Sequence, residues 1–234
     1  MKRWQAVAGA VLLGLGADAA LADRPFVATT SAAAEEDDDR VWSTSTWVHR
    51  DRRSSETGLA AEYAFEPRLS TEFTLARAKP RSPGSEAALE AEAELKWLYN
   101  SIARDGWGIG VSIGIGAGKD GDAGWRAGHR QVAVPFSWQW SDAGGLLHLN
   151  AGVARERGAR REALASAGLE APLARRWLAF AELARGGDER LAHAGVRWWI
   201  KRERFALDLS ALRRRPEGEG AVTAWVINLS ACDL

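Results

Sequence analysis

The sequence is poor in several features that would point to common classes of protein. It contains one cysteine, Cys232, so no internal disulfide can form. Although 46% of its residues are hydrophobic, no apolar run reaches the roughly 18 residues that a membrane-spanning helix needs. Lys and Arg together number 31, as do Asp and Glu, so there is no basic excess that would indicate a nucleic-acid partner. If the chain crosses a membrane, it must therefore cross as strands.

The first 40 residues predict an export signal followed by a leader. Residues 1–22 combine Lys2 and Arg3 with an apolar stretch and a small-x-small sequence at 20–22, which is typical of a cleaved secretory signal peptide. Residues 23–40 end in a run of five adjacent acids, which repel one another and cannot share a buried face. We expect residues 23–40 to be a flexible, solvated, acidic leader.

Alternation of apolar and polar residues dominates the rest of the chain. Over residues 87–99, one parity is apolar and the other carries Glu90, Glu92, Glu94 and Lys96. Successive side chains of a strand point to opposite faces, so such a strand has one apolar and one charged face. Alanine, glutamate and leucine also favour a helix, but a helix would spread these glutamates around its circumference.

A second alternating segment contains many glycines. Over residues 107–117, large apolar residues alternate with four glycines and Ser112. This glycine content disfavours a helix, and in a strand it leaves room on the inner side of a curved sheet.

The alternation predicts an all-β, antiparallel, up-and-down transmembrane β-barrel of about twelve strands over residues 41–230. The expected strands are 41–49, 59–65, 69–75, 87–99, 107–117, 132–140, 145–156, 162–171, 176–185, 190–200, 205–211 and 221–230. The alanine-rich stretch 162–185 is also compatible with a helix. Short connections alternate with charged, mostly longer ones, as the periplasmic turns and outer loops of bacterial outer-membrane barrels do.

The two parities of these strands predict an inner and an outer surface. The lumen-lining residues are expected to be Glu62, Glu72, Glu90, Glu92, Glu94, Lys96, His148, Asn150, Glu182, Arg197 and Asp208. Aromatic residues close to the short turns predict a girdle at the membrane–water boundary, where one ring edge is dry and the other wet. This aromatic girdle comprises Tyr63, Phe65, Trp97, Tyr99, Trp107, Trp138, Trp140, Trp177, Trp198 and Trp199.

Three short motifs resemble an outer-membrane transporter family known as "MetA-pathway of phenol degradation". Arg24-Pro25-Phe26-Val27 follows the predicted cleavage site, and residues 177–183 resemble that family's late strand with an inward glutamate. Gly195-Val196-Arg197-Trp198-Trp199, followed by Leu207-Asp208-Leu209, resembles its closing hairpin. The resemblance implies a membrane barrel related to transport.

We therefore expect an outer-membrane, porin-like channel or uptake barrel for an unknown small solute, with outer-membrane lipid as its partner and no cofactor. Acidic side chains in a lumen can select cations, or they can simply pair across it. Two alternatives remain: a soluble exported barrel that binds an apolar ligand, and a lipid-acting outer-membrane enzyme. The enzyme hypothesis rests on His148 and Asn150, which share one strand face but lack an evident nucleophile. His49, His129 and His193 are isolated and have no metal-ligand spacing.

Overall fold

The computed structural model describes residues 25–32, 41–82, 84–100, 102–141, 144–202 and 204–232. The predicted signal peptide at 1–22 and the acidic run of the leader lie outside the described residues.

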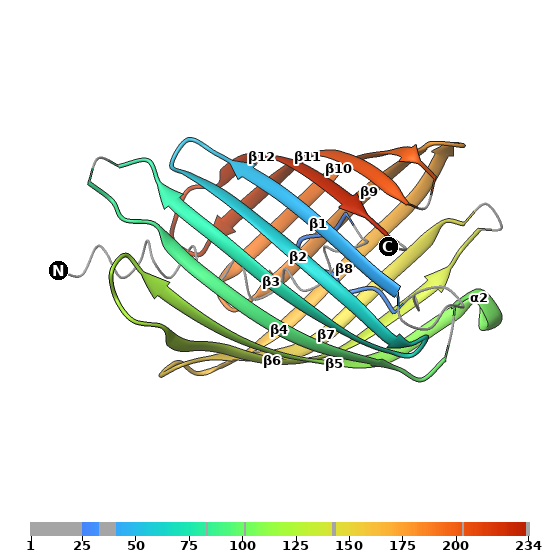
Figure 1. Cartoon of the computed structure of the whole chain (residues 1–234), viewed down its shortest axis with the longest axis horizontal. Helices are drawn as coiled ribbons and strands as arrows, with labels where there is room; N and C mark the ends of the chain where they lie inside the picture. Colours follow the sequence, from blue (N-terminus) through green and yellow to red (C-terminus); the bar gives the residue numbers. More distant parts are fainter. Residues whose placement is uncertain are drawn as a thin grey trace.

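Twelve strands form a closed barrel in which every strand pairs with its sequence neighbours and β1 pairs with β12. The strands are β1 (Val41–Arg50), β2 (Ser54–Glu66), β3 (Leu69–Pro80), β4 (Ala88–Leu98), β5 (Trp107–Asp120), β6 (Arg126–Gln139), β7 (Leu146–Glu156), β8 (Arg161–Ala174), β9 (Trp177–Gly186), β10 (Glu189–Lys201), β11 (Phe205–Pro216) and β12 (Val222–Ala231). Figure 1 shows them tilted strongly to the long axis of the barrel. The predicted fold class and strand number are confirmed, and the alanine-rich stretch 162–185 forms strands rather than a helix.

The alternation of the sequence becomes the inside and outside of the barrel. On β5, Ile113 is 50% exposed while its neighbour Ser112 is 1% exposed. Large apolar side chains on all twelve strands are exposed in the same way, so the outer surface carries an apolar belt. Within the described residues, no helix is long and apolar enough to cross a membrane.

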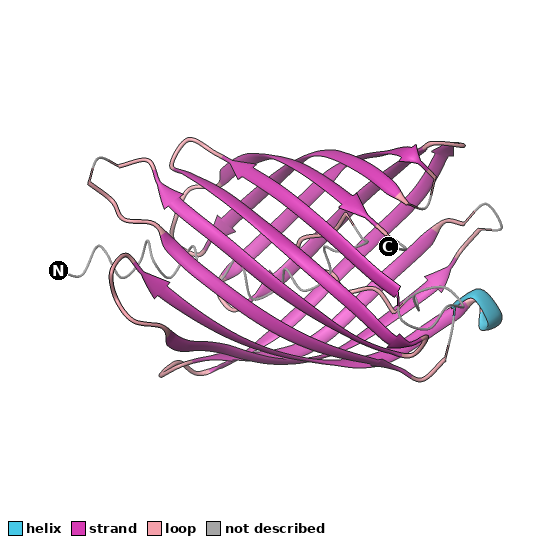
Figure 2. Cartoon of the chain, in the orientation of Figure 1, coloured by secondary structure: helices cyan, strands magenta, loops and turns pink. Residues whose placement is uncertain are grey.

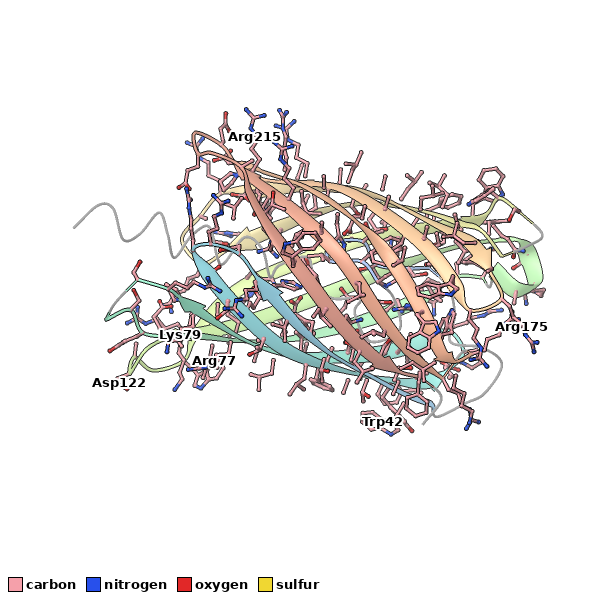
Figure 3. The ribbon with its side chains drawn as sticks, turned by 90° about the horizontal axis from the view of Figure 1, so that it is seen from above. Trp42, Arg77, Lys79, Asp122, Arg175 and Arg215 are labelled. Atoms are coloured by element: carbon pink, nitrogen blue, oxygen red, sulfur yellow. The ribbon has the colours of Figure 1, made fainter. Side chains whose placement is uncertain are left out.

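The barrel has two chemically different ends. We call one the helix end, because it holds the short helix α2 (Ile102–Asp105) together with the turn at 175–176. We call the other the arginine end, because basic side chains such as Arg77, Lys79 and Arg215 gather there (Figure 3). In the described part of the chain all other elements are strands, which are drawn in magenta in Figure 2 with α2 in cyan.

The connections at the arginine end are shorter than expected. They comprise residues 51–53, 81–87, 121–125, 157–160, 187–188 and 217–221, whereas those at the helix end comprise 67–68, 99–106, 140–145, 175–176 and 202–204. The predicted length difference is therefore wrong. The charged segments continue as paired strands instead of forming loops, because backbone pairing does not require apolar side chains.

The longest connection at the helix end is held by one side chain. Asn100 Nδ2 donates to the carbonyl oxygen of Trp107 at 2.9 Å, and its Oδ1 accepts from the amide of Ile109 at 3.0 Å. The amide group thereby replaces strand hydrogen bonds where β4 and β5 separate. The buried side chain of Ile102 anchors α2 beside them.

Candidate functional site

One side of the lumen is lined by carboxylates. Glu62 on β2, Glu72 on β3 and Glu94 on β4 are opposite one another in register, and all three are buried. Glu92 and Glu90 continue this row along β4 toward the arginine end. We call these five residues the glutamate wall. Because these glutamates lie opposite or next to one another on one face of paired strands, their like charges repel unless cations, protons or water compensate them.

Partial compensation of the glutamate wall comes from a few described side chains. Lys96 Nζ lies 3.0 Å from Glu62 Oε1, which also accepts from Ser70 Oγ at 2.6 Å. Farther along, His129 Nε2 lies 3.1 Å from Glu92 Oε1, and Gln131 Nε2 donates to that same oxygen at 3.1 Å. The row of five carboxylates thus has one ammonium and one imidazole in these two ion pairs.

The glycines of β5 make space for these glutamates. Gly114, Gly116 and Gly118 are in register with Glu94, Glu92 and Glu90 respectively. A Cβ atom added at Gly114 would lie 2.8 Å from a carboxylate oxygen of Glu92 and 2.7 Å from Gln131. A Cβ atom at Gly116 would overlap the ring of His129. The glycine alternation of the sequence therefore provides room for the polar residues of the lumen.

The opposite side of the lumen pairs its charges one by one. Arg197 on β10 donates to both carboxylate oxygens of Asp208 on β11, at 2.7 and 2.9 Å. Asn228 adds a third donor to Asp208 at 2.9 Å. His148 Nε2 lies 3.0 Å from Glu170 Oε1, and His193 Nδ1 lies 3.6 Å from Glu182 Oε2. We call this surface, formed by β7 to β11, the paired wall.

All four histidines of the chain face the lumen beside a glutamate. Besides the pairs of His129, His148 and His193, His49 Nδ1 lies 3.4 Å from Glu56 Oε1. The prediction that His49, His129 and His193 are isolated is therefore wrong in space, although it holds along the sequence. Each histidine lies on the inward parity of its strand, and this parity is the signal in the sequence that places it in the lumen.

Residues 25–32 lie inside the barrel, and we call them the plug. Seven of the eight are buried. The amides of Val27 and Ala28 donate to the two carboxylate oxygens of Glu182 at 2.9 and 2.8 Å, and the amide of Ala32 donates to Ser137 Oγ at 2.9 Å. The expected solvated leader is therefore wrong for these residues. Lumen side chains accept from three of their backbone amides, which lowers the penalty of burying them.

The ring of Phe26 fixes the plug among aromatic neighbours. It makes edge contacts with His148, at 5.3 Å between ring centroids, and with Phe180, at 6.2 Å. A Cβ atom added at Gly168 would lie 3.0 Å from the Phe26 ring, so this glycine provides the space for it. The plug thus occupies the lumen beside the paired wall.

Ser137, His148 and Glu170 form a hydrogen-bonded row across β6, β7 and β8. Ser137 Oγ lies 2.7 Å from His148 Nδ1, on the side of the ring opposite to Glu170. This is the residue set of a nucleophile, a base and an acid. However, the Ala32 amide occupies the hydroxyl, the Phe26 ring covers the imidazole, and neither side chain is exposed. Asn150, which the sequence placed with His148, lies in the lumen, and its Oδ1 has no hydrogen-bond partner among the described residues. Ser137 contacts the plug through the amide of Ala32.

Open space in the lumen lies toward the arginine end. One cavity of about 240 Å³ is lined by Glu90, Glu92, His129 and Glu156, among others. A second, of about 150 Å³, is lined by His49, Glu56, Glu189 and Arg214, among others. The inward residues of the helix end are, by contrast, tightly buried around the plug. Within the described residues, no cluster of His, Cys, Asp or Glu could hold a metal ion.

The aromatic residues of the predicted girdle lie on the outer surface, with one exception. Trp177 and Trp198 stack at 6.2 Å between ring centroids near the helix end. Trp199 instead shares the inward parity of Arg197, and its ring centroid lies 5.2 Å from the Arg197 guanidinium carbon. Placing both Trp198 and Trp199 in the girdle was therefore wrong, because adjacent residues of a strand face opposite sides. Trp42, which the prediction omitted, is exposed at the same end.

The predicted lumen residues all lie on inward parities. Nine of them are buried, namely Glu62, Glu72, Glu92, Glu94, Lys96, His148, Glu182, Arg197 and Asp208. Glu90 and Asn150 are half-buried. Sequence reasoning missed Ser137, Gln131 and Glu170, because only the register between strands shows that they meet these residues.

No family model matches the chain, and no curated protein sequence matches it. The resemblance to the phenol-degradation pathway family therefore stays a prediction. The structure is similar to that of a KdgM porin in complex with disordered oligogalacturonate, with a TM-score of 0.62, 7% identity, and coverage of 80% of this chain and 97% of that one. It is also similar to a NanC porin, with a TM-score of 0.55, 8% identity, and coverage of 82% of this chain and 98% of that one. At such low identity these likenesses show the shared fold.

Proposed function

We propose that this protein is a bacterial outer-membrane channel that admits small solutes from its arginine end. The observation that carries the proposal is the sorting of side chains. An apolar belt covers the outside of a closed barrel, and charged groups around open cavities fill its inside. A closed barrel leaves no unpaired strand edge in lipid, and a polar lumen serves water-filled passage. The fold shared with two proteins described as porins supports the same function.

The alternative of a soluble barrel that binds an apolar ligand required the tryptophan-rich faces to pack inward. Trp97, Trp138 and Trp177 are instead between 45% and 49% exposed on the outer surface. A soluble protein would leave this apolar belt in contact with water, at a cost proportional to its area. The membrane location is therefore the better proposal.

The glutamate wall favours cationic or neutral solutes over anionic ones. The KdgM porin is described in complex with oligogalacturonate, which is a polyanion. Basic groups also line the larger cavity, namely Lys119, Arg126 and Arg157. A polyanion that passes them would next meet the like charges of Glu90 and Glu92. Acidic rings of this kind select cations in pores.

The plug is proposed to limit passage through the barrel. Its contacts with Glu182, Ser137 and Phe180 hold it in the lumen beside the paired wall. Single-channel recordings in planar bilayers test both the cation preference of the lumen and the restriction of passage by the plug. We expect a small, cation-favouring conductance for the wild-type barrel, and a larger one when Phe26→Ala and Glu182→Ala are combined to release the plug. The control Phe65→Ala removes an exposed aromatic ring from the outer surface and should leave the conductance unchanged. If neither wild type nor the released variant conducts any small ion, the channel function is refuted.

The orientation is inferred from the even number of strands, which puts the start of β1 and the end of β12 at the helix end. We propose that the helix end, with Pro67 and Arg104, faces the periplasm, and that the arginine end, with Arg81, Asp122 and Glu217, faces outward. In a Cys232→Ser background, a cysteine at Ser82 should react with an impermeant thiol reagent on intact cells. A cysteine at Ser141 should react only after the outer membrane is opened. The reverse pattern would refute this orientation.

A further inference from the structure

Arginines on the outer face of the barrel form two rows of directly opposed like charges at the arginine end. In the first row, Arg130 on β6 is in register with Arg155 on β7, and Arg155 is in register with Arg161 on β8. In the second row, Arg190 on β10 is in register with both Arg185 on β9 and Arg215 on β11. All six side chains are exposed. We call the two rows the arginine triplets.

These charges are not neutralised by their own strands. The sequence pairs several of them with an adjacent acid, as in Arg155-Glu156, Arg161-Glu162 and Glu189-Arg190. Strand alternation turns each of these acids into the lumen and each arginine outward. In the described part of the chain, none of the six arginines forms an ion pair. Directly opposed like charges on strands are destabilising, so the rows require an external anion.

The position of the triplets indicates which anion this is. Two residues toward the helix end from Arg130, Arg155 and Arg185, the outward positions are Val132, Val153 and Leu183, which are at least 44% exposed. The arginines therefore begin where the apolar belt ends, which is the level of lipid headgroups in a membrane. A guanidinium binds phosphate with two parallel hydrogen bonds, and neighbouring strands repeat it at a spacing of about 5 Å.

We propose that the arginine triplets bind the phosphate groups of a multiply phosphorylated lipid in the leaflet around that end. The inference rests on the proposed outer-membrane location, but it does not depend on whether solutes pass through the lumen. Each row consists of three arginines on three neighbouring strands, so the preferred ligand carries more than one phosphate. Lipid bound there compensates the repulsion within each row and holds six consecutive strands in register.

Binding of bisphosphorylated lipid A to the full-length barrel, folded in a zwitterionic detergent, tests the proposal. The variant replaces the six arginines of both rows by glutamine, so that neither row remains. Its control replaces six exposed arginines in connections at the helix end by glutamine and so removes the same charge, namely Arg68, Arg104, Arg175, Arg176, Arg202 and Arg204. We expect the first variant to lose on the order of 100-fold in affinity, as the three basic residues of each row at an anionic lipid surface would contribute, and the control to lose less than about 3-fold. Equal affinities for the wild type and the triplet variant would overturn the proposal.

Two further arms separate lipid phosphate from other sources. Dephosphorylated lipid A should not compete for the site, and inorganic phosphate should compete only at far higher concentration. Competition by either at the concentration of lipid A would overturn the assignment.

Thermal unfolding gives an independent test, because the proposal predicts the direction in which each variant changes stability. In zwitterionic detergent the triplet variant should be at least as stable as wild type, because repulsion is removed. Added lipid A should stabilise the wild type and its Arg→Lys counterpart, but not the Gln variant. Equal stabilisation of all three would refute phosphate binding by the triplets, whatever the conductance recordings show.

Discussion

The two walls of the lumen handle buried charge in opposite ways. On the paired wall each acid meets one base, as Arg197 and Asp208 do through two hydrogen bonds. On the glutamate wall five carboxylates face Lys96 and His129, and the larger cavity opens beside them. The difference shows where water is needed. The acids of the paired wall have partners in the barrel wall and the plug, whereas the glutamate wall needs water or cations from the cavity.

The largest loss of unfolding free energy is expected when an ion pair of the paired wall is broken. Arg197→Met leaves Asp208 buried without its cation, and removal of one partner from a buried pair costs about 3–5 kcal/mol of unfolding free energy. Urea unfolding in lipid vesicles, followed by tryptophan fluorescence, measures this loss. The double variant Arg197→Met with Asp208→Leu should recover most of the stability. A loss below about 1 kcal/mol for the single variant would mean that the pair is hydrated like a surface pair.

A second prediction tests the inner and outer faces beside the glutamate wall. Ile113 and Ser112 are neighbours on β5 and face lipid and lumen respectively. Ile113→Arg should lower the unfolding free energy by about 2–4 kcal/mol, the cost of a cation near the bilayer midplane. Ser112→Arg should cost less, because its guanidinium meets the carboxylate of Glu94. Equal losses in the same urea assay would mean that the alternation on this strand has been assigned to the wrong faces.

The smallest effect on stability is expected from the glutamate wall itself. Combining Glu90→Gln, Glu92→Gln and Glu94→Gln keeps the shape and hydrogen-bonding capacity of the side chains while it removes three charges. We expect the unfolding free energy to change by less than about 1 kcal/mol, and the cation selectivity to fall in reversal-potential measurements. The variant Glu217→Gln, in an exposed turn at the arginine end, is the control and should change neither. A loss as large as that of Arg197→Met would show that the two walls are alike.

The barrel could be predicted because the alternation of apolar and polar residues is visible within each strand. Alternation along each strand indicated all twelve strands, including β8 and β9, where alanine-rich composition allowed a helix. The same rule turned Glu90, Glu92 and Glu94 toward the lumen. Trp199 was misassigned because proximity to a turn was given more weight than the parity it shares with Arg197.

The plug was not predictable because its contacts are distant in sequence. Val27 and Glu182 are 155 positions apart, and Ala32 and Ser137 are 105 apart. Residues 25–32 show no alternation, and their partners acquire meaning only after strands are placed in register. The histidine–glutamate pairs were hidden for the same reason. Patterns with a period of two are visible in a sequence, whereas the pairing of one strand with another is set by turns and by closure of the whole barrel.

The seam between β1 and β12 joins the barrel through seven residue pairs, whereas the other neighbouring strands share nine to twelve. It also connects the two segments farthest apart along the chain, so its loop-closure entropy is the largest. Closure is therefore expected to be the last and slowest step of folding. Because the plug lies only eight residues before β1 in the sequence and is inside the finished barrel, we expect it to be enclosed before that step. The position of the eight plug residues therefore implies an order of folding steps, since a barrel that closed first would have to admit them through one of its ends afterwards.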